Sequence, residues 1–534
     1  MRRAVVRATI VALLAAWPAL AQAKPDSTPP PKATRQRTAY EDMQMFSQVL
    51  NQIRVNHPDS IDMHELMMAA VDGMVHAADP HSFVMRRTPL SAEKEKAMLD
   101  GKLFPVPITF SYIDEAPVVI SVVAGTDAAK LDILWGDELI AIDGAPVLAD
   151  NEWELGLALA GPKKSMVHLT LERRRIDGTI VTLERDVKRE QPDRGESSVP
   201  AAFMLDKKTG YVRITTFMGE KISDDLHHSI SRLEDQGMER LILDLRDNGG
   251  GRIDEAAKVA GEFLPSGTIV YTAEGRKAEL ADTGRVSRSF WKSERRFPVI
   301  VMINAGTASA SELVAGALQD HDRALIVGQP SFGKALMMGG FPLSDGSMIE
   351  LVIGHVRTPC GRIVQRQYHS IARRDYYRLA RADRDTAGRP SCKTDGGRVV
   401  YGGGGIFPDI LYRDTETWPA WYLRLREEAL IIQWIGGYVT ASGAQFTNLD
   451  SLAAHPHLPP AAIEQFRAFA AKDSFNIPAG PEADSVLNRV LVRNVARVKW
   501  GDAGYFRLLA VFDGEVARAN TAFDKARSIT GPTH

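Results

Sequence analysis

The first regular hydrophobic pattern in the chain, at residues 40–56, has the spacing of an amphipathic helix. Its apolar side chains recur every three or four positions, so they share one helical face. They are Met43, Phe46, Val49, Leu50 and Ile53. A second helical run, at residues 63–77, ends before Asp79 and Pro80, because proline disfavours a helical conformation in the residue that precedes it. The two runs predict a small helical N-terminal module at residues 39–94.

Short, strand-like runs mark the next part of the chain, at residues 95–190. The expected strands lie at 117–123, 138–142, 166–171 and 179–185. Asp143 and Gly144 form a tight-turn signal between two apolar runs, and residues 152–160 fit a short helix. This order of elements predicts a small β domain.

From residue 210 onward, strand-like and helix-like runs alternate, which is typical of an α/β domain. The expected strands lie at 211–217, 241–245, 299–303 and 324–327, and the expected helices at 224–236, 254–264 and 311–319. They predict an α/β core at residues 195–412. Helix-like runs such as 421–435 then predict a helical C-terminal region at 413–534. The chain as a whole is expected to be a multidomain α+β protein.

The first 23 residues have the form of a cleavable secretory signal. Arg2, Arg3 and Arg7 precede an apolar run at 8–20, and small residues follow at Ala21 and Ala23. An internal helix is the alternative. We expect cleavage before Lys24, a flexible linker at 24–38, and export to the periplasm or the outside of the cell.

Composition narrows the range of partners. The chain has 534 residues, enough for three or four domains, and its net charge of −2 gives no electrostatic reason to expect a nucleic-acid partner. No run after residue 23 approaches 18 uninterrupted apolar residues, so no transmembrane helix is expected in the mature chain. Oligomeric state is not predicted.

The two cysteines, Cys360 and Cys392, admit two interpretations. In an oxidising compartment they pair and close a surface loop, and the alternative is two free thiols.

Two motifs near residue 330 resemble known catalytic or nucleotide-binding signatures without completing them. Residues 328–334 have the spacing of a phosphate-binding loop, but Ala335 stands where that motif needs a serine or threonine. Ser331 and Lys334 have the spacing of a β-lactamase pair, but the serine does not open a helix. The 13 histidines show no metal-ligand spacing, and His227 and His228 are expected to be solvated. We expect no cofactor and no metal.

The strongest candidate for chemistry is Ser309, in the run NAGTASASEL at 304–313. It lies between an expected strand and an expected helix, where unpaired backbone amides can stabilise an oxyanion. The alternative is structural, because Ser309 and Glu312 also have the spacing of a helix capping box.

Several long motifs in order resemble peptidase family S41, the carboxyl-terminal-processing or tail-specific peptidases. They are DPHS at 79–82, LDLRDNGGG at 243–251, GTASASEL at 306–313, AGALQD at 315–320, VGQPSFGK at 327–334, PLSDG at 342–346 and YGGGGIFPD at 401–409. The resemblance covers about residues 40–412. It implies a PDZ-like domain at 95–190, a module that captures peptide C-termini, and a crotonase- or ClpP-like peptidase core.

The resemblance implies a Ser–Lys dyad that cleaves unfolded or flexible polypeptides, near their C-termini. Ser309 matches the family nucleophile and Lys334 its general base, while amides of Ala310 and of Gly250 or Gly251 match the oxyanion hole. A lysine acts as a base only when it is neutral, which requires burial or positive neighbours. The residues next to Lys334 in sequence are apolar or glycine, so we expect few carboxylates near it.

Two positions depart from the family pattern. Met338 stands where many members carry a glutamine that orients the lysine, and residues 103–107 lack the glycines of a carboxylate-binding loop. These departures leave an alternative function open beside the preferred endopeptidase, namely a weakly active or inactive peptide-binding protein of the same fold.

Overall fold

The computed structural model describes residues 38–530 except 87–88, 114, 124, 191–196, 220, 288–293, 370, 383–384 and 414–416. The expected signal at 1–23 and nearly all of the expected linker lie outside the described residues. The chain forms two units, residues 1–70 and 71–534.

The two N-terminal helices are confirmed. They are α1 (Ala39–Asn56) and α2 (Met63–Ala78). Thr38 caps α1 through a reciprocal pair of hydrogen bonds with Glu41, and no residue of α1 is buried. The helix therefore exposes its apolar face, including Phe46 and Val49.

The expected β domain is a sheet with the strand order β2-β3-β4-β6-β7. Its strands are β2 (Ile108–Ile113), β3 (Ala116–Val122), β4 (Glu138–Ile142), β6 (Met166–Arg174) and β7 (Ile180–Lys188), with β5 (Ala145–Pro146) beside β4. Helix α4 (Glu152–Leu159) packs Leu155 against Leu139, Leu169 and Val119. The sequence did not indicate β2 or helix α3 (Pro89–Leu99), which precedes the sheet.

The central sheet has the strand order β19-β14-β13-β10-β9-β8. Its strands are β8 (Ala201–Met204), β9 (Thr209–Arg213), β10 (Arg240–Asp244), β13 (Val299–Ile303), β14 (Leu325–Gly328) and β19 (Ile410–Leu411). Neighbouring strands from β9 to β19 run parallel, so their carboxyl ends meet at one edge. Every residue of β13 and β14 is buried, because helices cover both faces of a parallel sheet.

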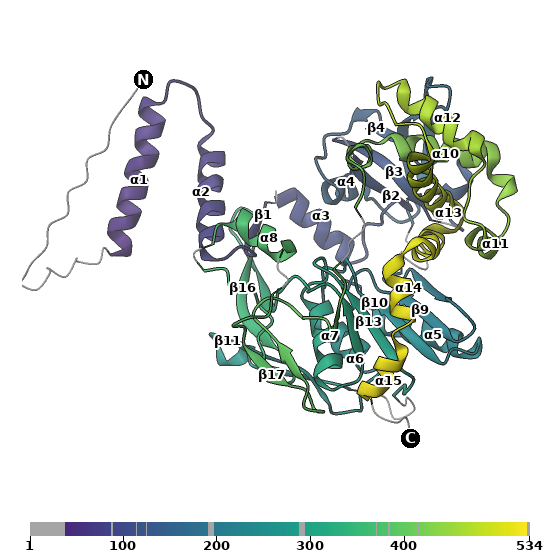
Figure 1. Cartoon of the computed structure of the whole chain (residues 1–534). Coiled ribbons are helices and arrows are strands. Elements are labelled where there is room, and N and C mark those ends of the chain that lie inside the picture. The colour runs from purple at the N-terminus through teal and green to yellow at the C-terminus, as the bar shows by residue number, and fades with distance from the viewer. Residues whose placement is uncertain are drawn as a thin grey trace, which may run out of the picture. The chain divides into compact units, whose positions relative to one another are not determined.

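Helices cover the central sheet from two parts of the chain (Figure 1). Leu241 and Leu243 face the side of α5 (Ile222–Asp235), α6 (Ile253–Ala260) and α7 (Ala310–Asp320). Ile242, between them, faces the other side, which the C-terminal helices α14 (Gly514–Asn520) and α15 (Phe523–Thr530) cover. The end of the chain therefore completes the core of the central sheet.

A second sheet lies beside the central one. It comprises β1 (Phe83–Met85), β11 (Ile269–Gly275), β12 (Asp282–Arg285), β15 (Leu336–Pro342) and β16 (Met348–Arg357), and β16 pairs with β1, β11 and β15. Helix α8 (Arg373–Ala382) and the hairpin of β17 (Ser391–Lys393) and β18 (Val399–Tyr401) follow it in sequence.

The C-terminal region is helical, but the single expected helix at 421–435 is wrong. It divides into α9 (Ala420–Leu425) and α10 (Leu430–Ser442), followed by α11 (Leu449–Ala454), α12 (Pro460–Ala471) and α13 (Pro481–Phe512). Their core forms around Trp434 and Phe466. None of the described helices is apolar enough over a sufficient length to span a membrane.

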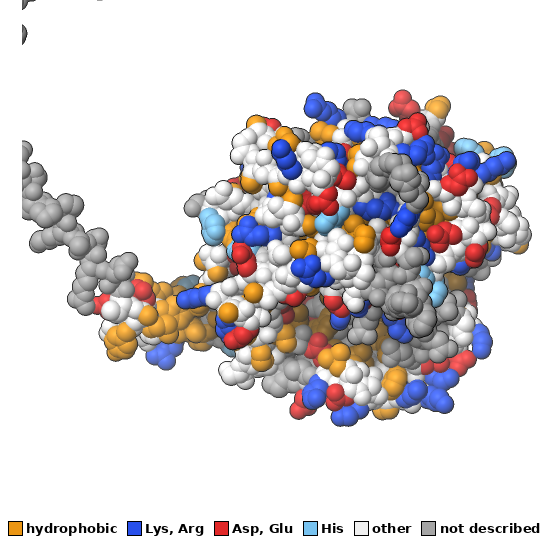
Figure 2. Space-filling view, turned by 90° about the horizontal axis from the view of Figure 1, so that it is seen from below, with side chains coloured by type: hydrophobic (Ala, Val, Ile, Leu, Met, Phe, Trp, Pro, Cys, Tyr) orange, Lys and Arg blue, Asp and Glu red, His pale blue; other side chains and the backbone are white. Residues whose placement is uncertain are grey.

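The surface carries charges of both signs. Figure 2 shows basic and acidic side chains interspersed over one face of the molecule. This agrees with the net charge of −2.

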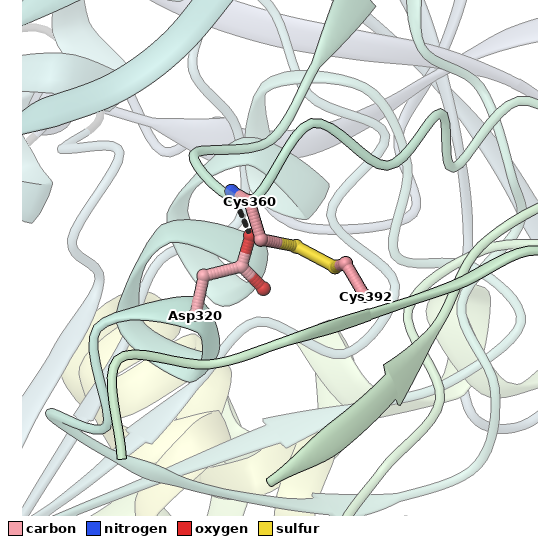
Figure 3. Close-up of side chains that lie close together, drawn as sticks. All are labelled: Asp320, Cys360 and Cys392. Atoms are coloured by element: carbon pink, nitrogen blue, oxygen red, sulfur yellow. Dashed lines mark hydrogen bonds between the residues drawn. A yellow bond between two sulfur atoms is a disulfide. The ribbon is translucent and has the colours of Figure 1, made fainter. Parts of the chain in front are cut away.

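A disulfide bond joins Cys360 and Cys392, whose Cα atoms are 6.1 Å apart. Asp320 accepts a hydrogen bond of 3.1 Å from the Cys360 amide, so the bond is anchored to the end of α7 (Figure 3). The closed loop contains α8.

We expect the exported protein to contain no free thiol. Thiol labelling under denaturing conditions should give no adduct without reductant and two adducts after reduction. Closure of a loop of this size stabilises a fold by about 3–4 kcal/mol, so replacing both cysteines with serine should lower the melting temperature. Two labelled thiols without reductant would contradict the pairing.

Candidate active site

Ser309 occupies a strained turn between β13 and α7. Its φ of 57° and ψ of −120° are unusual for a residue with a side chain. The turn is fixed from both sides: Thr307 donates to the Leu245 carbonyl at 2.8 Å, and the Ala308 amide donates to the Asn248 carbonyl at 2.9 Å. Strain of this kind persists where the surroundings impose it, and it presents the half-buried Ser309 at the start of a helix.

Glu312 links the Ser309 turn to the loop that carries Lys334. Its side chain is fully buried. Within the described residues, four donors reach its carboxylate: the amides of Ser309, Gly333 and Lys334 at 2.8 Å each, and the Ser331 hydroxyl at 2.5 Å. The capping interaction expected from sequence is thus present on the Glu312 side, and the same carboxylate also fixes the position of the lysine loop.

Lys334 lies in the loop between β14 and β15. Burial lowers the pKa of its ammonium below the usual 10.5, while Glu312 and Asp79 oppose the shift. The expectation of few nearby carboxylates was therefore wrong, because Glu312 approaches from 22 positions earlier in the chain and Asp79 from another segment. Desolvation nevertheless outweighs both charges, which favours the neutral amine.

Of the residues expected to form an oxyanion hole, Gly250 packs against Ser309, and Ala310 is the next residue in sequence. Gly250 has a φ of 94°, and a Cβ there would lie 2.7 Å from the Cβ of Ser309, so only glycine fits. The Gly250 amide donates to the Asn248 side chain at 2.9 Å. Among the described residues, no acceptor contacts the amides of Gly251 and Ala310. Of the two alternatives for the first donor, Gly251 is the one with a free amide.

A buried histidine that sequence reasoning missed lies beside Lys334. His81 contacts the Tyr376 hydroxyl through Nε2 at 2.9 Å and packs edge-on against Phe332. Burial, with the nearby charge of Lys334, lowers the pKa of His81 to about 4, so it is neutral near pH 7. The DPHS motif contains His81, but nothing in the sequence brings Tyr376 to it from 295 positions away.

Gln365 is a second missed residue near the lysine loop. It accepts a hydrogen bond of 2.9 Å from the Ala335 amide and donates to the Tyr376 hydroxyl at 3.1 Å. Met338 lies half-buried on β15, opposite Val352, at an irregularity in the strand pairing. A glutamine side chain therefore does support the lysine loop, but it comes from Gln365, which follows β16 in sequence, and not from position 338.

The competing motifs take other structures. Residues 328–334 lead from β14 through a loop to β15, and no helix follows as a phosphate-binding loop requires. His228 is exposed as expected, but the expectation for His227 was wrong, because its Nδ1 contacts Glu262 at 3.0 Å and Arg295 at 3.1 Å.

A strained serine at a helix N-terminus, amides without an acceptor in the same region and a half-buried lysine on another loop are the groups that a serine hydrolase needs. Residues 208–371, which contain all of these groups, match the model of peptidase family S41. The chain belongs to this family and is a serine peptidase.

Proteins of similar sequence are named carboxyl-terminal-processing proteases. The chain is 32% identical over 338 residues to the carboxy-terminal-processing protease of Bartonella bacilliformis, covering 62% of this chain and 74% of the relative. It is 34% identical to the carboxyl-terminal-processing protease of Synechocystis sp., covering 47% of this chain and 56% of the relative. A solved photosystem II D1 C-terminal processing protease is 22% identical, with a TM-score of 0.34, over 75% of this chain and 92% of that one.

Proposed function

We propose that this chain is an endopeptidase that cleaves unfolded or flexible polypeptides near their C-termini with a Ser309–Lys334 dyad. The observation that carries the proposal is the Glu312 carboxylate, which holds the amides of Ser309 and Lys334 at 2.8 Å each and so fixes the two loops together. A cap that served only the helix would not need the lysine loop.

In the proposed mechanism, neutral Lys334 accepts the proton of the Ser309 hydroxyl as its oxygen attacks the peptide carbonyl. The amides of Ala310 and Gly251 donate to the oxyanion of the tetrahedral intermediate. Lys334 then gives its proton to the leaving amine as the C–N bond breaks, which leaves Ser309 as an ester. Water, deprotonated by the neutral lysine, hydrolyses the ester and restores the serine.

Polypeptide substrates and export follow from several features together. The relatives are named carboxy-terminal-processing proteases, a β domain lies where the resemblance implies a PDZ-like domain, and the first 23 residues have the form of a secretory signal. In the β domain, the amides of Leu103 and Phe104 already donate to the carbonyls of Ala97 and Gly161. We infer that this domain binds C-termini weakly or acts as a gate.

Replacing Met338 with glutamine separates the endopeptidase from the alternative, a weakly active peptide-binding protein. If Lys334 lacks an orienting hydrogen bond, the new amide should supply it and raise turnover about ten- to a hundredfold, the equivalent of 1–3 kcal/mol. We would measure cleavage rate and melting temperature together. A lower melting temperature without faster turnover would show that Met338 serves only packing.

The proposed function is tested by incubating an unfolded protein such as casein with the mature chain and with its Ser309→Ala variant. We expect fragments from the wild type and none from the variant. A wild type that produces no fragments would favour the binding protein, and fragments from the variant would exclude Ser309 as the nucleophile.

A further inference from the structure

A large cavity lies between the central sheet and the C-terminal helices, apart from the groups assigned to the dyad. Its volume is about 800 Å³, which is within the range of ligand pockets. Arg213 at the end of β9 and Arg246 and Asp247 just after β10 line one side. Residues of α9, α13 and α14 line the other. The cavity therefore opens at the carboxyl ends of the parallel strands, the edge that also carries Ser309 after β13.

Arginines dominate the lining, and those on the sheet side are neutralised. Arg246 pairs with Asp244, Asp513 and Glu515, each at 2.7–2.9 Å. Arg213 pairs with Asp244 at 2.9 Å and with Asp247 at 3.3 Å. These arginines are held by the fold and leave little charge for a ligand.

Arg493 and Arg426, on the helical side, differ from them. In the described part of the chain, no carboxylate lies within 4.0 Å of either guanidinium. Arg493 is 6% exposed, and its Nε has no hydrogen-bond partner. It stacks near Trp418 and Tyr505, with its guanidinium carbon 5.9 and 5.8 Å from the ring centres. A buried guanidinium without an anion is costly, so an anionic ligand would relieve this site.

The lining indicates the chemistry of that ligand. A planar guanidinium held against aromatic rings binds a carboxylate through two parallel hydrogen bonds. Tyr505, Phe506 and Phe512 supply an apolar wall beside it. The site thus fits a carboxylate joined to an apolar side chain, which is the form of the last residue of a polypeptide.

The cavity is connected to the Ser309 turn. The Asp247 amide donates to the Asn304 side chain at 2.9 Å, and the Asn304 side chain donates back to the Asp247 carboxylate at 2.8 Å. Asn304 begins the loop that ends at Ser309, and Gly250 follows Asp247 by three residues. A polypeptide whose end lies in the cavity can thus continue along the same sheet edge toward the nucleophile.

We propose that this arginine cavity binds the terminal carboxylate of the substrate polypeptide and so selects substrates by their C-terminus. The inference rests on the proposed function, since it concerns the substrate of the same enzyme. In this proposal the arginines of the cavity donate hydrogen bonds to the terminal carboxylate. They take the place of the glycine-rich carboxylate-binding loop that residues 103–107 lack.

The test uses the full chain with Ser309→Ala, which permits binding to be measured without cleavage. The probes are two fluorescent, unstructured peptides of one sequence with an apolar last residue, one a free acid and the other an amide. We expect the acid to bind at least about tenfold more tightly than the amide. Adding Arg493→Gln should reduce this ratio to near one, and Arg493→Lys should restore part of it.

Two further variants guard against a folding artefact. Arg426 is exposed, so Arg426→Gln should leave the melting temperature unchanged and still reduce the ratio. Arg527, an exposed arginine of α15 paired with Asp524, provides the matched control, and Arg527→Gln should leave the ratio unchanged. Equal affinity for acid and amide, or a ratio that survives both Arg493→Gln and Arg426→Gln, would overturn the proposal.

The two proposals fail in different ways. If the wild type cleaves an unfolded protein but the acid preference is absent, only the cavity assignment fails. If the acid preference depends on Arg493 while the wild type cleaves nothing, the cavity assignment holds and the peptidase mechanism fails.

Discussion

Replacing Lys334 with methionine should lower kcat/KM on an unfolded polypeptide by about a thousandfold or more. Methionine keeps the length of the side chain and suits its buried surroundings, but it cannot accept the Ser309 proton. Loss of a general base costs on the order of 10²–10⁴-fold, and the effect is larger where the base also activates the nucleophile. The melting temperature should stay the same or rise, because a partly buried charged group is removed.

The pH dependence of the wild type gives the same test a second readout. Because the neutral amine is the active form, kcat/KM should rise with pH through the pKa of Lys334, which burial places below 10.5. Lys208→Met, at a surface lysine paired with Glu239, should change neither the rate nor its pH profile. Normal turnover in Lys334→Met would exclude the dyad.

Replacing Glu312 with glutamine should lower kcat about ten- to a hundredfold. A glutamine amide nitrogen cannot accept a hydrogen bond, so at least one of the buried amides of Ser309, Gly333 and Lys334 loses its partner, at a cost of about 1–3 kcal/mol. The loss should move Ser309 and Lys334 relative to each other. The same change removes a carboxylate that raises the pKa of Lys334, so the rise of kcat/KM should shift to lower pH.

The pH dependence of the free energy of unfolding provides a second test of the role of Glu312. Burial raises its pKa from 4.5 to about 7, so the native state binds this proton more tightly than the unfolded state does. The group's contribution to stability should therefore fall as the pH rises from about 4.5 to 7, and Glu312→Gln should remove this dependence. Glu255 is equally buried and accepts from the Ser223 amide at 3.1 Å, away from the dyad. Glu255→Gln should lower the melting temperature without shifting the pH profile; equal shifts in both variants would contradict the assignment.

Local patterns were enough to predict the parts of the fold that are continuous in sequence. The strand at 299–303 was confirmed because five consecutive apolar residues between Pro298 and Asn304 indicate a strand buried on both faces. Ser309 and Lys334 could be proposed because long motifs surround each of them. The second sheet could not be predicted, because β16 obtains its partners from β1 and β11, more than 70 positions away, and Gly339 and Gly340 weaken the strand signal of β15.

The chemistry around Lys334 was predicted less well, for a related reason. Neighbours in sequence indicated an apolar environment, whereas the charged groups that act on Lys334 are Glu312 and Asp79, from distant parts of the chain. The arginine cavity is likewise formed by residues far apart in sequence. Arg246 pairs with Glu515, 269 positions away, and no motif connects them. Long-range ion pairs leave no local periodicity, so they become visible only when the chain is folded.

The measurement that tests the dyad most directly is the labelling of the intact protein with a fluorophosphonate, which phosphonylates an activated serine and releases fluoride. Digestion and mass spectrometry then locate the modified residue. We expect one adduct, on Ser309, in the wild type, and no adduct at the same reagent concentration in Ser309→Ala or Lys334→Met. An adduct on another serine, or equal labelling of Ser309 in Lys334→Met, would contradict the Ser309–Lys334 mechanism.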